Sequence, residues 1–136
     1  MMRYSYYPGC TLHSSAKDYD QSVKAVCAVL GIELMEVDDW NCCGATAVPS
    51  VDQELADILS LRNLARAEAV NGQVVTACNA CYLALKRIAL KMAEDSKLRA
   101  SHLKLLEQTG LQFKGWVKIQ HLLEIVTDLE PNLLKE

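Results

Sequence analysis

Hydrophobic and polar positions along the chain follow two periods in turn. Four short segments are rich in apolar, β-branched or aromatic residues, as strands are, and they cover 3–8, 32–37, 74–77 and 113–120. Between them, apolar residues recur every three to four positions, which predicts helices from Ser14 or Ser15 to about Leu30, from Ser50 to about 70, at 79–94, from Ser96 to about 109, and at 121–129 before Pro131.

Alternation of strands and helices predicts an α/β fold. We expect a three-layer structure in which helices cover both faces of a mostly parallel four-stranded sheet, with strand order 2-1-3-4. The 136 residues suffice for one domain with its own hydrophobic core, so a single domain over residues 1–136 is predicted.

Composition narrows the class of function. A net charge of −3 offers no basic field for a phosphate backbone, so we expect no nucleic-acid partner. No apolar run reaches the ~18 residues of a membrane span, and the N-terminus lacks a signal-peptide pattern. A cytoplasmic location is therefore expected, where thiols stay reduced and six cysteines favour metal or redox chemistry over disulfides.

Three groups of cysteines follow three predicted strands. Cys10 comes after the first strand, Cys42 and Cys43 after the second, and Cys78 closes the third. The carboxyl ends of parallel strands lie on one edge of a sheet, so these positions are predicted to converge there. Cys81, three residues after Cys78 at the start of a helix, shares a helical face with it.

The number of converging cysteines limits the type of centre. A single zinc ion or an ordinary cubane cluster takes four thiolates, and five are available. Either one cysteine is spare or the centre is not an ordinary cubane. Cys27 stands apart, because it lies on the apolar stripe of a predicted helix and is expected in the core.

Several neighbours of these cysteines have two possible roles. Gly9 and Gly44 allow close approach of the backbone to a centre. Asn41 and Asn79 are either hydrogen-bond partners of the centre or caps of turns. Trp40 either shields the centre or packs as an ordinary aromatic residue.

The histidines and basic residues give few indications of function. His13 is a candidate proton donor to a leaving thiolate, although a surface or capping role is favoured. His102 and His121 receive no role. The Lys and Arg residues between Lys86 and Lys104 are interpreted as a solvated helical face, or alternatively as a contact for an acidic partner subunit.

The pattern C-x31-C-C-G-x33-C-x2-C and the words "YYPGC", "DWNCCGAT" and "ACNACY" resemble the cysteine-rich CCG-domain family. In particular, they resemble the N-terminal half of the B subunit of heterodisulfide reductase, and the similarity extends to "HLLE" near the end of the chain. The resemblance implies a noncubane 4Fe–4S cluster held by five cysteines, which in this chain are Cys10, Cys42, Cys43, Cys78 and Cys81.

The family's activity is implied by the resemblance as well. In heterodisulfide reductase, two CCG domains bring two clusters together to cleave the disulfide of coenzymes M and B. Other CCG proteins are electron-transfer subunits of quinone-linked dehydrogenases. The second CCG domain is absent from these 136 residues, so we expect a second domain or half-subunit, an iron–sulfur electron-donor subunit, and a disulfide or thiol substrate as partners.

Two alternatives remain open. In the first alternative, four of the cysteines form a structural zinc site. Zinc is also a possible substitute for the cluster in protein produced in air. In the other, Cys78 and Cys81 act as a thiol–disulfide pair, which leaves the distant cysteines unexplained.

Overall fold

The computed structural model describes residues 2–44 and 48–129. Within these ranges the elements are β1 (Met2–Tyr6), α1 (Gly9–His13), α2 (Lys17–Val29), β2 (Ile32–Glu36), α3 (Val48–Val51), α4 (Gln53–Val70), β3 (Gln73–Thr76), α5 (Asn79–Glu94), α6 (Ser96–Glu107), β4 (Lys118–His121) and α7 (Leu122–Thr127). The predicted helix stop at Pro131 lies outside the described residues. None of the helices in the described ranges has the length and apolar character needed to cross a bilayer.

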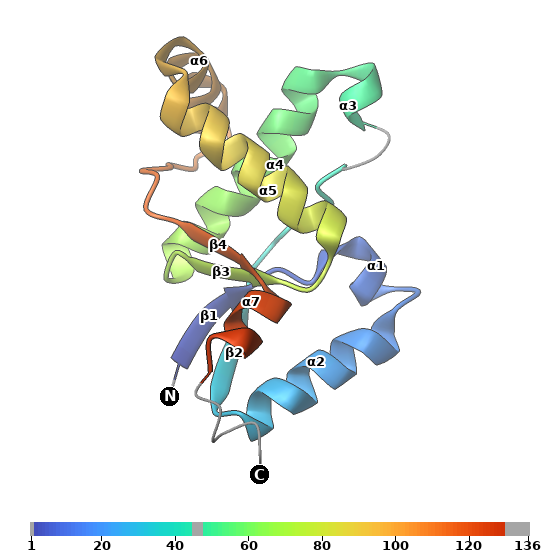
Figure 1. Ribbon diagram of the computed structural model, residues 1–136. Helices are drawn as coiled ribbons and strands as arrows, with labels where there is room; N and C mark the ends of the chain where they lie inside the picture. Colours follow the sequence, from blue (N-terminus) through green and yellow to red (C-terminus); the bar gives the residue numbers. More distant parts are fainter. Residues whose placement is uncertain (1, 45–47, 130–136) are drawn as a thin grey trace.

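All four strands belong to one parallel sheet with the order β2-β1-β3-β4. Tyr6 of β1 lies between Glu36 of β2 and Val75 of β3, and Val75 in turn pairs with Gln120 of β4. The predicted α/β class, parallel sheet and strand order are confirmed. The carboxyl ends of β1, β2 and β3 therefore lie together at one end of the sheet, called its carboxyl edge below. Strand β4 is one of the two outermost strands (Figure 1).

Two hydrophobic cores fill the spaces above and below the sheet. Val74 points into a core that it shares with α4, α5 and α6, while its neighbour Val75 points into a second core with α2 and α7. Each of these valines is 1% exposed, as expected of a parallel strand covered on both faces. In Figure 1 the helices of the first core lie above the sheet and α2 and α7 lie below it.

Three segments differ from the prediction. The helix expected from Ser50 is divided into α3 and α4, and Asp52 caps α4 by accepting a hydrogen bond from the Leu55 N–H. Residues 9–13 form the short helix α1, which begins directly after Pro8, a residue whose φ of −73° is compatible with a helix start. Strand β4 begins at Lys118 and not at residue 113. Instead, the Glu68 carboxylate of α4 accepts hydrogen bonds from three successive backbone N–H groups, those of residues 114–116, which holds this segment as a loop.

A buried ion-pair network joins α4, α5 and α6. Asp57 is 7% exposed and accepts hydrogen bonds from Gln53 (3.0 Å), Lys91 (3.0 Å) and His102 (3.0 Å). Burial would raise the pKa of the Asp57 carboxyl, but these three donors outweigh it and hold the pKa below its usual value. Lys91 therefore does not belong to a purely solvated face, and His102 has a structural role that its position in the sequence did not reveal.

His121 also has a structural role. Its ring nitrogen Nδ1 accepts a hydrogen bond from the Leu123 N–H (3.1 Å), while the Glu124 carboxylate accepts one from the His121 N–H (3.0 Å). The two bonds together form a capping box at the start of α7. The His121 ring also packs edge-on against Tyr82 of α5, with centroids 5.9 Å apart.

Candidate metal centre

Five cysteines gather at the carboxyl edge of the sheet. Cys10 lies on α1 just after β1, Cys42 and Cys43 lie in the segment after β2, and Cys78 and Cys81 lie at the start of α5 after β3. The Cys10 and Cys42 sulfurs are 3.4 Å apart, and the Cys43 and Cys81 sulfurs are 3.9 Å apart. Residues more than thirty positions apart in sequence are thus in contact because parallel strands end at one edge.

Burial divides this group into an inner and an outer part. Cys43 and Cys81 are each 5% exposed and belong to the first core, whereas Cys10 and Cys42 are exposed to solvent. Cys78 is intermediate. A centre built on these sulfurs would therefore be anchored in the core and open to a small molecule on one side.

The start of α5 positions two of the sulfurs. Cys78 occupies the N-cap, and its sulfur accepts a hydrogen bond from the Cys81 N–H at 3.4 Å. Similarly, the Cys42 sulfur accepts a hydrogen bond from the Gly44 N–H at 3.4 Å. Backbone N–H groups directed at sulfur favour thiolates, which are the forms that bind metal.

Crowding of the sulfurs opposes ionisation as long as no cation is present. The hydrogen bond with Cys43, followed by burial and by contact with Cys78, raises the pKa of the Cys81 thiol. At Cys42 the Gly44 N–H lowers the pKa, but burial together with Cys10 and Cys43 outweighs this effect and raises it. Neighbouring thiolates repel one another, and positive metal ions bound among them would offset this repulsion and favour the thiolate form. The set of sulfurs therefore suits a metal centre.

Gly9 allows the backbone to approach the Cys81 sulfur closely. Its φ is +80°, and a Cβ atom at this position would lie 2.8 Å from the Cys81 sulfur. Gly44, at φ +66°, is crowded by Val48 instead, with 2.7 Å between its added Cβ and a Val48 methyl carbon. The sequence-based expectation of close backbone approach to the sulfurs therefore holds for Gly9.

The segment that carries Cys42 and Cys43 is held by hydrogen bonds to β1 and α4. The backbone carbonyl of Asn41 accepts hydrogen bonds from the Tyr7 hydroxyl (2.7 Å) and from the Asn63 amide (2.8 Å). Asn63 also accepts one from the Asn41 N–H (2.9 Å). Both Tyr7 and Asn63 are buried, so the segment has a defined position relative to the sheet.

The side chains next to the cysteines mainly support the loop. The Asn41 amide donates to the carbonyls of Cys42 and Leu59, at 2.9 and 3.1 Å, which favours the turn-capping interpretation over contact with a centre. Trp40 packs edge-on against Tyr7 and His13, with ring centroids 5.5 and 5.3 Å away. Asn79 is exposed at the first position of α5.

Cys27 lies elsewhere in the fold. It is 1% exposed and packs in the second core, on α2, as its place on the apolar stripe predicted. Within residues 2–44 and 48–129, no three His, Cys, Asp or Glu side chains are placed to coordinate one metal ion.

The family model of the cysteine-rich CCG domain matches residues 4–86. The 8-methylmenaquinol:fumarate reductase membrane anchor subunit of Wolinella succinogenes is 32% identical over 90% of this chain and 43% of its own length. An Archaeoglobus profundus protein described as similar to the B subunit of heterodisulfide reductase is 29% identical over 90% of this chain and 41% of its own length.

One further relative and one solved structure are similar to this chain. The B subunit of the ferredoxin/F420H2-dependent CoB-CoM heterodisulfide reductase of Methanosarcina acetivorans is 25% identical over 99% of this chain and 46% of its own length. The fold is shared with a solved structure of a hypothetical protein from Helicobacter pylori (TM-score 0.81, 16% identity, 93% of this chain and 25% of that one). The chain spans less than half the length of these curated relatives, which are subunits of oxidoreductases or resemble them. Because the family model covers residues 4–86, more than half of the chain, the chain belongs to the cysteine-rich CCG-domain family.

Proposed function

We propose that the chain is an electron-transfer unit of a disulfide-reducing oxidoreductase and holds a noncubane 4Fe–4S cluster. Its ligands in this proposal are Cys10, Cys42, Cys43, Cys78 and Cys81. The observation that carries the proposal is that these five sulfurs, and not that of Cys27, meet at one edge of the sheet. Five converging thiols suit a centre with several metal atoms better than a single ion.

The cluster, when bound, would supply the electrons that cleave a disulfide. The chain's own residues would provide the rest of the site. Gly9 leaves room beside the Cys81 sulfur, and Tyr7 holds the backbone that carries the adjacent cysteines. The exposed side of Cys10 and Cys42 would admit a disulfide or thiol substrate. His13 contacts the Trp40 ring, and its role as a proton donor stays a prediction.

Partners follow from the length of the relatives. Because the chain covers 41–46% of the heterodisulfide reductase subunits that it matches, we propose that a second CCG domain or half-subunit completes the active unit. We further propose an iron–sulfur subunit as electron donor and a cytoplasmic location. The relative with 32% identity supports a second candidate, an electron-transfer subunit of a quinone-linked dehydrogenase.

Anaerobic reconstitution with iron and sulfide tests the proposal. We expect roughly four irons per chain and a paramagnetic resonance signal that changes when a thiol is added. A signal that ignores thiols but is reduced by a menaquinol would favour the quinone-linked candidate. One zinc per chain with no iron binding would instead indicate a metal-stabilised module and refute the cluster.

Matched cysteine variants test the ligand assignment. Cys43→Ser removes an inner sulfur and should lower iron content severely, whereas Cys27→Ala removes a buried sulfur of the second core and should leave iron content unchanged. Equal loss of iron in the two variants would contradict the proposed set of ligands.

A further inference from the structure

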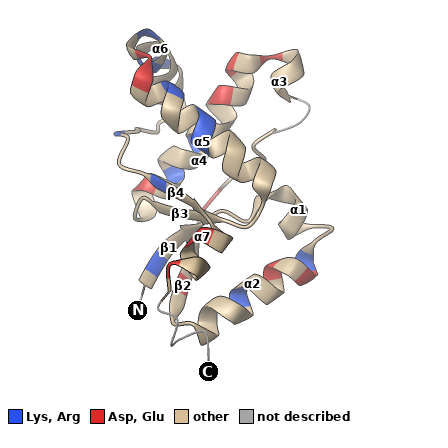
Figure 2. Ribbon diagram, in the orientation of Figure 1, with Lys and Arg blue, Asp and Glu red and all other residues tan. Residues whose placement is uncertain are grey.

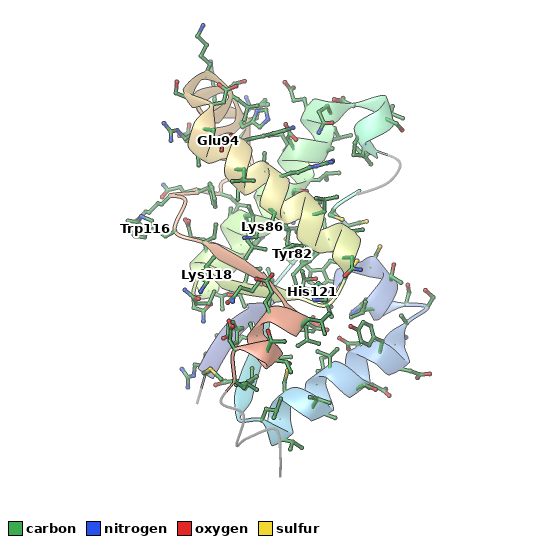
Figure 3. All side chains as sticks on the ribbon, in the orientation of Figure 1. Tyr82, Lys86, Glu94, Trp116, Lys118 and His121 are labelled. Carbon is green, nitrogen blue, oxygen red and sulfur yellow. The ribbon has the colours of Figure 1, made fainter. Side chains whose placement is uncertain are left out.

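A groove lies between α5 and the edge strand β4, on the side of the sheet that holds the first core. Its volume is about 500 Å³, within the range of specific binding sites. The groove, called the α5–β4 groove below, is lined by Lys86, Ala89, Leu90, Met92, Ala93, Arg99, Phe113, Lys114, Gly115, Val117, Lys118 and Ile119. Figure 3 shows Lys86 on α5 and Lys118 at the start of β4, with Trp116 at the outer end.

The floor of this groove is rigid because it is part of the core. Met92, Phe113 and Ile119 are 3, 8 and 3% exposed, and all three belong to the first core. The outer wall is fixed as well, since the Glu68 carboxylate binds the backbone N–H groups of residues 114–116 at 2.8–2.9 Å. The groove is therefore formed before any partner arrives, which reduces the entropy cost of binding.

Charge around the groove has one sign. Four lining residues are basic, namely Lys86, Lys114, Lys118 and Arg99, and among the described residues no Asp or Glu side chain lines it. Blue segments lie on α5 and at the start of β4 in Figure 2. The whole chain carries a net charge of −3, so this basic rim stands out against an acidic background.

The carboxylates near the groove either have hydrogen-bond partners already or do not line it. Glu68 is occupied by the three backbone N–H groups, and Glu124 is bound to the His121 N–H and to the Tyr82 hydroxyl while also attracting Lys86. Glu94, the last residue of α5, directly follows the lining residue Ala93 but does not itself line the groove (Figure 3). The basic rim is thus only partly compensated within the described part of the chain.

Chemistry of the lining distinguishes two kinds of occupant. Specific small-molecule sites depend on a few convergent polar groups that orient the ligand. Within residues 2–44 and 48–129, no Ser, Thr, Asn, Gln, Tyr or His side chain lines this groove, and its cations come from α5, α6, β4 and the preceding loop. Cations spaced around an apolar floor fit an extended chain with alternating acidic and apolar side chains.

An exposed aromatic residue strengthens the argument for a protein partner. Trp116 is 73% exposed, and the Lys114 ammonium lies 5.0 Å from its ring centroid. Tryptophan and arginine are enriched at the centres of protein interfaces, and the rims of such interfaces are polar. We propose that the α5–β4 groove binds an acidic amphipathic segment of a partner protein, with its apolar side chains on Met92, Phe113 and Ile119 and its carboxylates on the four cations.

Nuclear magnetic resonance of the isotope-labelled full chain tests this. The probe is a short synthetic peptide in which glutamate and leucine alternate, and the control is the same peptide with glutamine in place of glutamate. The chain has two tryptophans, so two indole N–H signals report on two places. We expect the glutamate peptide to move the Trp116 signal and leave that of Trp40, which lies by the cysteines, unmoved.

Charge-reversal variants complete the test. Exposed ion pairs are worth little singly, but reversing two rim charges in Lys86→Glu/Lys118→Glu should weaken peptide binding roughly tenfold. Lys17→Glu, a single charge reversal at an exposed position of α2, should leave binding unchanged. This measurement needs no iron, so its failure is distinct from failure of the proposed cluster.

Four results of the peptide measurements would overturn the proposal. They are equal binding of the glutamine peptide, no movement of the Trp116 signal, equal weakening by Lys17→Glu, and displacement of the peptide by inorganic pyrophosphate with the same signals moved. The last would make the groove a site for small anions. Movement of the Trp116 signal on simple concentration of the free protein would identify a second copy of the chain as the occupant and would also refute the acidic partner.

Discussion

Gly9→Ala isolates the contribution of one backbone position to the cysteine centre. The added Cβ atom would lie 2.8 Å from the Cys81 sulfur, at a residue with φ +80°. Gly31 is a matched control, because its φ is +74° and an added Cβ meets nothing within 4 Å. The two variants therefore share the backbone strain, and only one of them touches a sulfur.

Both variants should lose a similar amount of stability. Placing an L-residue in the left-handed region costs about 1–2 kcal/mol, which at this chain length lowers Tm by about 3–8 °C. The contact in Gly9→Ala adds little energy, because the atom that must move is the end of a cysteine side chain. Loss of stability alone should not separate the two.

Displacement of the sulfur should separate them. An ordinary Cβ contact begins at 3.4 Å, so the Cys81 sulfur must retreat by the difference from 2.8 Å, about 0.6 Å. Metal–ligand distances tolerate only about 0.2 Å of deviation. Gly9→Ala is therefore expected to lose most of its iron after reconstitution, while Gly31→Ala keeps it.

The assay pairs denaturant unfolding of the metal-free protein with iron analysis after anaerobic reconstitution. The reasoning is refuted if Gly9→Ala loads as much iron as Gly31→Ala. It is also refuted if the two unfold at clearly different denaturant concentrations, because the energetic effect would then be more than backbone strain.

Three further predictions concern the groups that support the site and the groove. Asp57→Asn should lower the free energy of unfolding in urea by about 2–3 kcal/mol, because it removes the negative charge that accepts hydrogen bonds from His102 and Lys91. Since the folded-state pKa of Asp57 is lowered, its stabilisation is present above its usual pKa of about 4 and is lost as the pH falls through the lowered value, so the deficit of the variant should shrink in acid. Tyr7→Phe should cost about 1 kcal/mol in the same assay, because the Asn41 carbonyl loses one of its two donors; an unchanged unfolding midpoint would contradict this. Glu68→Ala should speed hydrogen exchange at the three loop amides that its carboxylate binds, and slow exchange at all three would show that the loop is held by other contacts.

The sequence alone determined the architecture and the position of the candidate centre. Short apolar strands separated by helical periods require parallel strands, and parallel strands bring their carboxyl ends to one edge. The cysteines at 10, 42–43 and 78 follow three such ends, so their convergence depended only on local pattern and a general rule of topology. Cys27 could be separated from them because it lies within a helix stripe.

Tertiary structure decided whatever depends on a particular pair of side chains distant in sequence. The Asp57–His102 bond joins residues 45 positions apart, and neither has a local pattern that signals the other. Residues 114–116 lie within the segment predicted as a strand, yet they form a loop because the Glu68 carboxylate, from α4, accepts hydrogen bonds from their N–H groups. The loop before β4 contributes Phe113, Lys114, Gly115 and Val117 to the lining of the α5–β4 groove. Periodicity specifies which face of an element is buried, but the partner on that face is set by packing of the whole chain.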